Sequence, residues 1–171
     1  MLTFLGNIIA YSQVFLDKFF YSKIYEDIIK LFSRSENALS VLRLIIWVAA
    51  QSMKFIKTVP PKEKIVELIT IFANYLYTTD SEVIFHCIWG LNYASKYDDE
   101  FLDICKLILN SGAVVKIMKL NFIKNNLILI PTVRLLGNLS SGPYSIVDVI
   151  IFFLIILFRN CWNLNFSTSW T

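Results

Sequence analysis

Four long apolar segments of the chain end in similar short motifs, and this recurrence is the strongest constraint on the fold. The motifs are Leu5-Gly6-Asn7, Trp47-Val48-Ala49-Ala50-Gln51, Trp89-Gly90-Leu91-Asn92-Tyr93 and Arg134-Leu135-Leu136-Gly137-Asn138. Their last residues are separated by 44, 42 and 45 residues in turn. Intervals of roughly 40–47 residues are typical of solenoids built from two- or three-helix units, in which each unit buries its apolar face only against its neighbours.

Helical periodicity and helix-end signals agree with such a repeat. Apolar residues recur at helical spacing along most of the chain, with little strand-like alternation. Asp80 or Ser81 can cap a helix N-terminus, Gly112 and Gly142 can end helices, and Pro60-Pro61 marks a break. We predict helices at 2–13, 22–33, 37–55, 62–77, 81–96, 99–110, 113–120 and 127–141.

The predicted fold class is therefore all-α. We expect an armadillo-repeat right-handed solenoid, with about three repeats plus a partial N-terminal one, over residues 1–142. Residues 143–171 are expected to form a divergent hydrophobic C-terminal tail. In such a solenoid the last helix of every unit lines one continuous concave surface.

The apolar content leaves a second interpretation open. Hydrophobic residues make up 56% of the chain, above the roughly 45–50% usual for soluble domains. Either most helices are buried on more than one face, or part of the chain meets a membrane. The apolar run at 149–158 is about half of the roughly 20 residues that a spanning helix needs. The alternative is therefore a membrane-associated protein whose segment from about Ile146 to Phe158 inserts or lies in the interface.

Several other classes find little support. The net charge of +3 comes from scattered Lys and Arg residues, a weak signal for nucleic-acid binding. The three cysteines, Cys87, Cys105 and Cys161, show no Cys-x-x-Cys spacing, and no signal peptide is evident, which favours a reducing intracellular compartment.

Chemistry at a catalytic or metal site is also not expected. His86 and Cys87 are adjacent on a helix and point in different directions, so packing explains them better than metal binding or thiol catalysis. The acidic run at 98–100 suits the N-terminal end of a helix dipole. We predict no catalytic residues, no metal, no cofactor and no enzyme activity.

The repeated motifs supply a candidate binding surface instead. Positions four apart share a helix face, so the pairs Trp47 with Gln51, Trp89 with Tyr93 and Arg134 with Asn138 would project side by side, with Asn7 in line at the N-terminal end. An Asn or Gln amide can both donate to and accept from a peptide backbone. Neighbouring indoles can hold the stem and charge of a Lys or Arg. The implied ligand is an extended basic peptide.

The order of these landmarks resembles the importin-alpha family. The resemblance covers roughly residues 3–142 and rests on consecutive segments in the family's order. These are Leu42-Arg43 before Trp47, the Pro60-Pro61 linker, Asp80-Ser81-Glu82-Val83 leading to Cys87-Ile88-Trp89-Gly90-Leu91-Asn92-Tyr93, then Ser111-Gly112-Ala113-Val114-Val115, and Pro131-Thr132-Val133-Arg134-Leu135-Leu136-Gly137-Asn138.

The resemblance implies an adaptor for protein import into the nucleus, which binds nuclear localisation signals of cargo proteins and is found in cytoplasm and nucleus. Asn7, Trp47, Trp89, Tyr93, Arg134 and Asn138 match the family's ladder. Thr3 stands where a Trp would precede Asn7, and Gln51 stands for an Asn. Cargo peptides are the expected partners, whereas importin-beta is a doubtful one, because the sequence shows no counterpart of the basic N-terminal segment through which the family binds it.

Four of the ladder residues also have an ordinary structural interpretation. Aromatic residues at helical spacing are usually core residues, which applies to Trp47 and Trp89. Asn7 and Asn138 each follow a Gly and can be helix-end residues. A third hypothesis is therefore a structural remnant that keeps the repeat fold and binds no cargo.

Overall fold

The computed structural model describes residues 1–34, 38–54, 60–96, 104–120 and 126–140, together with the single positions 148, 151 and 155. Within these ranges the regular structure is helical, without strands. The helices are α1 (Leu2–Tyr11), α2 (Gln13–Phe20), α3 (Lys23–Phe32), α4 (Leu39–Ser52), α5 (Lys62–Tyr75), α6 (Ser81–Ala94), α7 (Ile104–Asn110), α8 (Ala113–Lys119) and α9 (Asn126–Ser140).

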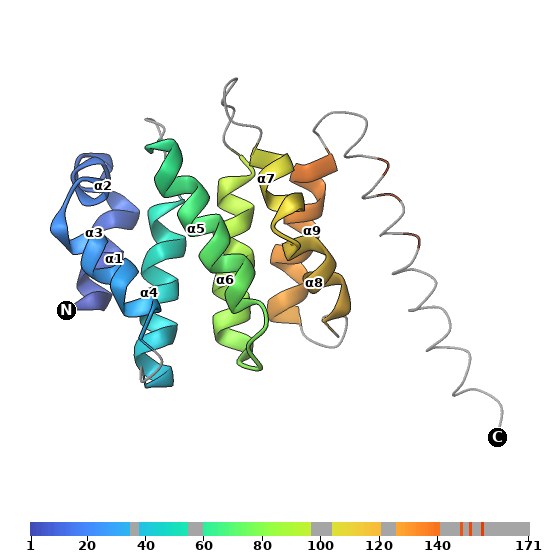
Figure 1. The fold of residues 1–171 in the computed structure, drawn as a ribbon, viewed down its shortest axis with the longest axis horizontal. Coiled ribbons are helices and arrows are strands. Elements are labelled where there is room, and N and C mark those ends of the chain that lie inside the picture. Colours follow the sequence, from blue (N-terminus) through green and yellow to red (C-terminus); the bar gives the residue numbers. More distant parts are fainter. Residues whose placement is uncertain are drawn as a thin grey trace.

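The helices form two layers that lie against each other, and within each layer the helices follow one another along the long axis of the molecule (Figure 1). In the first, which we call the ladder layer, α1 packs on α4, α4 on α6, and α6 on α9. The second layer consists of α2 and α3, then α5, then α7 and α8. Each second-layer group leads into the next ladder helix, so three repeats follow the single helix α1. This arrangement confirms the predicted all-α repeat architecture.

One helix was not predicted. Residues 13–20 form α2, whose Leu16, Phe19 and Phe20 are buried, whereas the sequence interpretation continued the first helix to residue 13. The backbone of Ser12 is extended, with φ −132° and ψ 111°, so it separates α1 from α2. With eight residues, α2 gives too short an apolar pattern to stand out between the longer patterns of the two predicted helices on either side of it.

Some predicted bounds cannot be compared in full. The start of the helix expected at 99–110 and the ends of the helix expected at 37–55 lie outside the described residues, and α7 is described from Ile104. The predicted tail, 143–171, lies outside them as well, except for its three exposed single positions. Within the described part, no helix combines the length and apolar character required to cross a bilayer.

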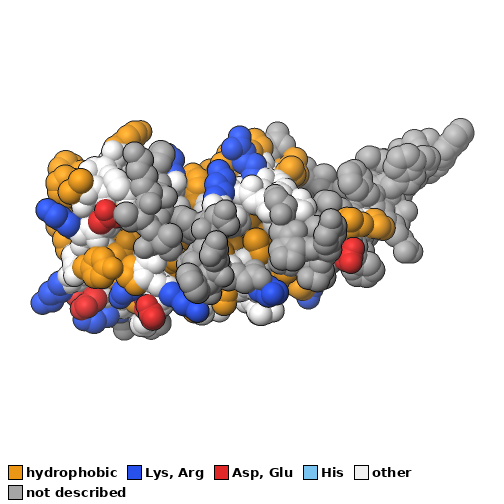
Figure 2. Space-filling view, turned by 90° about the horizontal axis from the view of Figure 1, so that it is seen from above, with side chains coloured by type: hydrophobic (Ala, Val, Ile, Leu, Met, Phe, Trp, Pro, Cys, Tyr) orange, Lys and Arg blue, Asp and Glu red, His pale blue; other side chains and the backbone are white. Residues whose placement is uncertain are grey.

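A continuous apolar core joins the two layers. Buried side chains from α1 to α9 form one cluster, to which the second layer contributes Ile28, Leu68, Phe72 and Ile117 among others. Apolar side chains also gather at the end of the molecule formed by the first helices (Figure 2). Exposed residues there include Phe4, Tyr11, Phe15 and Tyr21. A repeat end with an uncovered apolar face is expected of a solenoid, since only neighbouring repeats cover such faces.

Glycine allows a close helix contact in this core. A Cβ atom on Gly90 of α6 would lie 2.5 Å from two ring carbons of Phe72 on α5, a residue with no exposed surface. Carbon atoms pack optimally at about 3.5–4.0 Å. The sequence therefore brings α5 against α6 at a point where no side chain fits on Gly90.

Candidate functional site

The structure places every predicted ladder residue in the ladder layer. Asn7 lies on α1, Trp47 and Gln51 on α4, Trp89 and Tyr93 on α6, and Arg134 and Asn138 on α9. Asn7 and Arg134 are exposed, and the other five side chains are half-buried. Because these helices lie side by side, the pairs form successive rungs along one side of the solenoid. A role for these residues in peptide binding stays a prediction.

Trp47 borders an open cleft between α1, α4 and α6. Its ring lies against Gly6 of α1, where a Cβ atom would collide with it. The same indole lines a cleft of about 470 Å³ together with Thr3, Ser40, Arg43, Leu44, Glu82 and His86. The absence of a large side chain at Gly6 thus lets the ring pack on α1 while it remains half-buried. The cleft offers an aromatic wall beside a carboxylate.

An ion cluster beside this cleft joins α4 to the start of α6, and its Arg43 and Glu82 line the cleft together with Trp47. Arg43 donates to both Asp80 carboxylate oxygens, at 3.2 Å and 2.7 Å, and its Nε lies 3.1 Å from the Glu82 carboxylate. The Arg43 guanidinium holds the pKa of Asp80 below its ordinary value. The Asp80 side chain is 13% exposed and that of Glu82 is 52% exposed. Two carboxylates against one guanidinium leave the cluster net negative, with Glu82 facing solvent.

The cluster separates the Trp47 cleft from a second one. That second cleft, of about 580 Å³, lies between α4, α6 and the start of α9. It shares Arg43, Glu82 and His86 with the first and adds Phe85 and Leu127. The two clefts together therefore extend across the four ladder helices, from α1 to α9.

His86 and Cys87, adjacent on α6, differ in their exposure. Cys87 is fully buried and burial raises the pKa of its thiol, whereas half-buried His86 lines both clefts. Burial lowers the pKa of His86, and the Glu82 carboxylate opposes this effect more weakly. Among the described residues, no three His, Cys, Asp or Glu side chains gather as metal ligands would.

Trp89 stands at the centre of the next rung. Its ring stacks on Tyr93, with centroids 5.3 Å apart and planes inclined by 30°, and meets the Phe85 ring edge at 6.2 Å. The Arg134 guanidinium from α9 lies over the indole, 5.6 Å from its centroid. The predicted aromatic surface of Trp89 is thus present, and Arg134 of the same chain covers it.

Asn138 makes contacts that the sequence did not reveal. Its Nδ2 donates to the Ser95 hydroxyl at 2.9 Å and lies 3.2 Å and 3.3 Å from the side-chain and main-chain oxygens of Asn92. Asn92 has no exposed surface, and its own Nδ2 donates to the Pro131 carbonyl at 3.3 Å. These contacts cross-link α6 and α9. The Asn138 amide hydrogens are therefore committed to the fold, and its carbonyl oxygen is the group left for a ligand.

Sequence reasoning missed the polar residues that shape the clefts. The sequence gives Arg43 only as a landmark of the resemblance, although it lies one helical turn before Trp47 and thus on the same face. Asp80 had been expected to cap α6, which it does by accepting from the Val83 N–H at 2.9 Å. Its second role, holding Arg43, depends on the approach of α4 to α6 and has no local signal.

No protein-family model and no curated protein matches the chain. Among solved structures it is similar to designed armadillo repeat proteins. One is the designed armadillo repeat protein YIII(Dq.V1)4CPAF in complex with peptide (KR)4, with a TM-score of 0.72 at 17% identity, over 89% of this chain and 62% of that one. Another belongs to computationally designed armadillo repeat proteins for modular peptide recognition, with a TM-score of 0.70 at 15% identity and coverages of 89% and 62%.

These likenesses establish the class of fold. The chain is an all-α armadillo-type solenoid, as the repeat period predicted. It spans about three fifths of the length of these two designed proteins. At this level of identity the likeness extends to the fold alone.

Proposed function

We propose that this protein binds extended basic peptides along the ladder layer and serves as an adaptor of the nuclear import type. The observation that carries the proposal is the Trp47 cleft, which the half-buried indole and the exposed Glu82 side chain line together. The stem of a ligand Lys or Arg can lie along the indole, with its charge near both the ring and the carboxylate. Each such contact contributes roughly 0.5–2 kcal/mol.

Local charge supports a basic ligand in spite of the mildly basic chain. The net charge of +3 belongs to the whole sequence, whereas the cluster that borders the cleft carries two carboxylates and one guanidinium. A ligand responds to charges within about a Debye length, roughly 8–10 Å at physiological salt. The cleft therefore attracts a cation where the protein as a whole does not.

The two aromatic rungs are not equivalent in this proposal. Arg134 already covers the Trp89 ring, so a ligand cation has to displace it or avoid that rung. Among the described residues no arginine covers the Trp47 ring, and the nearby Arg43 is held by Asp80 and Glu82. We infer that Trp47 is the principal cation slot and that Trp89 is a secondary one.

Backbone recognition completes the groove. Asn7 is exposed on α1, and the carbonyl oxygen of Asn138 is available on α9. Side-chain amides of this kind hold an extended main chain without reading its sequence. A designed armadillo protein of similar fold was solved with the peptide (KR)4, which is a precedent for basic ligands on this architecture. The resemblance to importin-alpha adds nuclear localisation signals as the ligand class, and cytoplasm and nucleus as the location.

The test is a fluorescence titration of a labelled Lys/Arg-rich localisation peptide at low and physiological salt. We expect saturable binding that weakens with salt, falls strongly in a Trp47→Ala, Trp89→Ala double variant, and falls more in Trp47→Ala than in Trp89→Ala. Removing the competing cation with Arg134→Gln should strengthen binding. An Asp/Glu-rich peptide of equal length is the matched control.

Either of two results would reject the proposal. Equal affinity of the intact chain and the folded double variant would leave the solenoid as a remnant without a working ladder. Equal affinity for the acidic and basic peptides would show that the Glu82 carboxylate does not select the ligand.

A further inference from the structure

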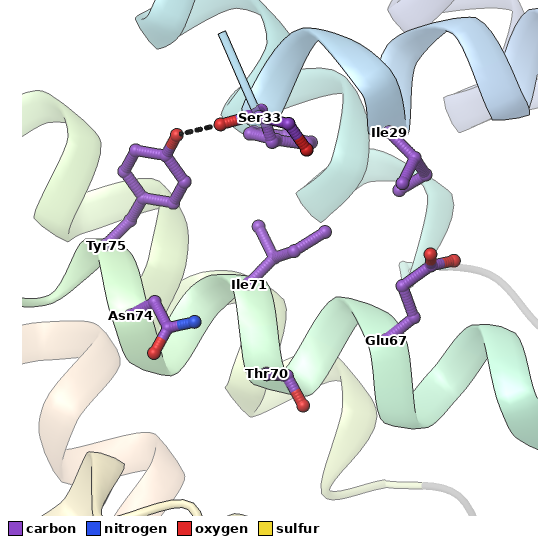
Figure 3. A pocket seen from close by; sticks show the side chains of 8 residues that line it. Ile29, Ser33, Glu67, Thr70, Ile71, Asn74 and Tyr75 are labelled. Carbon is purple, nitrogen blue, oxygen red and sulfur yellow. Dashed lines mark hydrogen bonds between the residues drawn. The ribbon is translucent and has the colours of Figure 1, made fainter. Parts of the chain in front are cut away.

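A separate cleft lies in the second layer, between α3 and α5. Its volume is about 370 Å³, and its walls come from these two helices alone (Figure 3). Ile29 of α3 and Ile71 of α5 point into the same space, while Tyr75 and Glu67 stand at opposite ends of it. Because no ladder helix contributes to the lining, this cleft is distinct from the proposed groove.

Two tyrosine hydroxyls tie the helices together at the ends of the cleft. The Tyr75 hydroxyl donates to the Phe32 carbonyl at 2.9 Å, and the rings of these residues lie 5.6 Å apart. The Tyr25 hydroxyl donates to Glu67 Oε2 at 2.7 Å. Burial raises the pKa of both tyrosines, so both hydroxyls keep their protons and remain donors. These cross-links hold α3 and α5 in fixed positions on either side of the cleft.

The apolar part of the cleft is incompletely covered. Ile29, Phe32 and Ile71 pack against the core and remain half-buried. Thr70 and Asn74 are exposed along one edge. A small molecule in so open a cleft would stay largely in water, whereas ligand pockets usually bury 70–90% of their ligand. A side chain that belongs to a longer peptide suits this shape better.

Charge defines the chemistry of the occupant. Glu67 supplies the only carboxylate of the lining, is half-buried, and forms no ion pair within the described part of the chain. Lys64, one turn earlier on α5, lies over the Tyr25 ring at 4.3 Å instead. A half-buried carboxylate with one tyrosine donor gains from a ligand cation, because charge-assisted hydrogen bonds are the stronger class.

We propose that this cleft docks a partner peptide segment that carries a large aliphatic side chain next to a Lys or Arg. The aliphatic side chain lies between Ile29 and Ile71, and the cation pairs with Glu67. The exposed Asn74 amide, which can donate and accept, binds the peptide main chain. This docking site does not depend on the ladder, so the protein can hold two peptides at once.

The test uses the full chain with Trp47→Ala and Trp89→Ala, so that the ladder does not contribute. The probe is a capped, fluorescein-labelled peptide of alternating leucine and lysine that carries a photoreactive group. A companion peptide of alternating leucine and glutamate lacks the cation, and one of alternating serine and lysine lacks the aliphatic side chain, so the two test whether both groups are needed. Glu67→Gln removes the charge, and Glu63→Gln makes the same change on exposed α5 surface outside the cleft.

We expect saturable binding of the leucine–lysine probe alone, with photocross-links in α3 or α5. Glu67→Gln should weaken it about two- to fivefold, the range of a partly exposed ion pair, and Glu63→Gln should leave it unchanged. Asn74→Trp, at an exposed rim position, should cover the cleft and abolish binding. Circular dichroism verifies that each variant is folded. Cross-links confined to other helices, equal effects of the two glutamate variants, or absence of binding by the folded protein would overturn the proposal.

Discussion

Substitution of Gly90 by Ala tests whether the contact between α5 and α6 is as tight as the structure indicates. In a helix interior, Gly→Ala by itself stabilises by about 1 kcal/mol. At Gly90, however, the new Cβ would lie 2.5 Å from two carbons of the Phe72 ring and 2.9 Å from a third. To reach a normal carbon–carbon distance the ring would have to retreat by about 1 Å. Phe72 has no exposed surface, so this movement disturbs close-packed neighbours.

Overpacking of this kind typically costs 1–3 kcal/mol. Combined with the propensity gain of about 1 kcal/mol, the expected change for Gly90→Ala is a destabilisation of about 0–2 kcal/mol. Gly137→Ala is the matched control, because Gly137 also lies in a ladder helix and nothing approaches its missing Cβ within 4 Å. That variant should stabilise the protein by up to about 1 kcal/mol.

Urea unfolding at 25 °C, followed by far-ultraviolet circular dichroism, measures both variants against the parent chain. Similar denaturant dependences are required before free energies are compared, because repeat proteins can depart from two-state unfolding. If Gly90→Ala stabilises the protein as much as Gly137→Ala, then Phe72 can move freely, and the close approach does not constrain the packing of α5 on α6.

Three further expectations follow from single side chains. Asp80→Ala loses both the α6 cap and the Arg43 contact, so it should lower the free energy of unfolding by about 1–2 kcal/mol. Asp80→Asn keeps the cap and should cost less. Equal losses of the two variants in urea unfolding would contradict the capping role. Burial lowers the pKa of His86, so its protonation favours the unfolded chain and the stability of the fold should decrease as the pH drops below about 6.5. Thermal unfolding between pH 7.5 and 5.5 measures this, and the unfolding temperature of His86→Gln should depend less on pH than that of the parent chain. Cys87 is fully buried and its thiol pKa is raised, so it should resist iodoacetamide until the protein unfolds, while half-buried Cys105 reacts earlier. Equal alkylation rates of the two cysteines by mass spectrometry would refute this.

Much of the fold was predictable, because its signals are local or strictly periodic. The recurrence that ends in Asn7, Gln51, Tyr93 and Asn138 located all four ladder helices before any contact was known. Side chains four apart share a helix face in any α-helix, so the stacking of Trp89 on Tyr93 was implicit in the spacing. The failures were also local: Ser12 interrupts the first helix, and the eight residues of α2 gave too short a pattern.

The candidate site was predictable only in outline. Sequence spacing placed Trp47 and Trp89 in line. It could not show that Arg134 covers the Trp89 ring, and that no arginine of the described residues covers the Trp47 ring. Nor could it show that Asn138 donates to Asn92, 46 residues earlier in the chain, rather than to a ligand. Each of these outcomes depends on the distance and rotation between neighbouring ladder helices.

The sequence by itself determined the helical class, the repeat period and the phase of each helix, because these follow from backbone geometry and the position of apolar residues within one unit. Only the tertiary structure decided which polar groups meet across units. The Arg43 cluster with Asp80 and Glu82, and the cleft that Tyr25 and Tyr75 delimit between α3 and α5, join residues about one repeat apart. Their pairing depends on how one repeat stacks on the next, and that stacking depends on close-packed contacts between ladder helices such as Trp47 on Gly6.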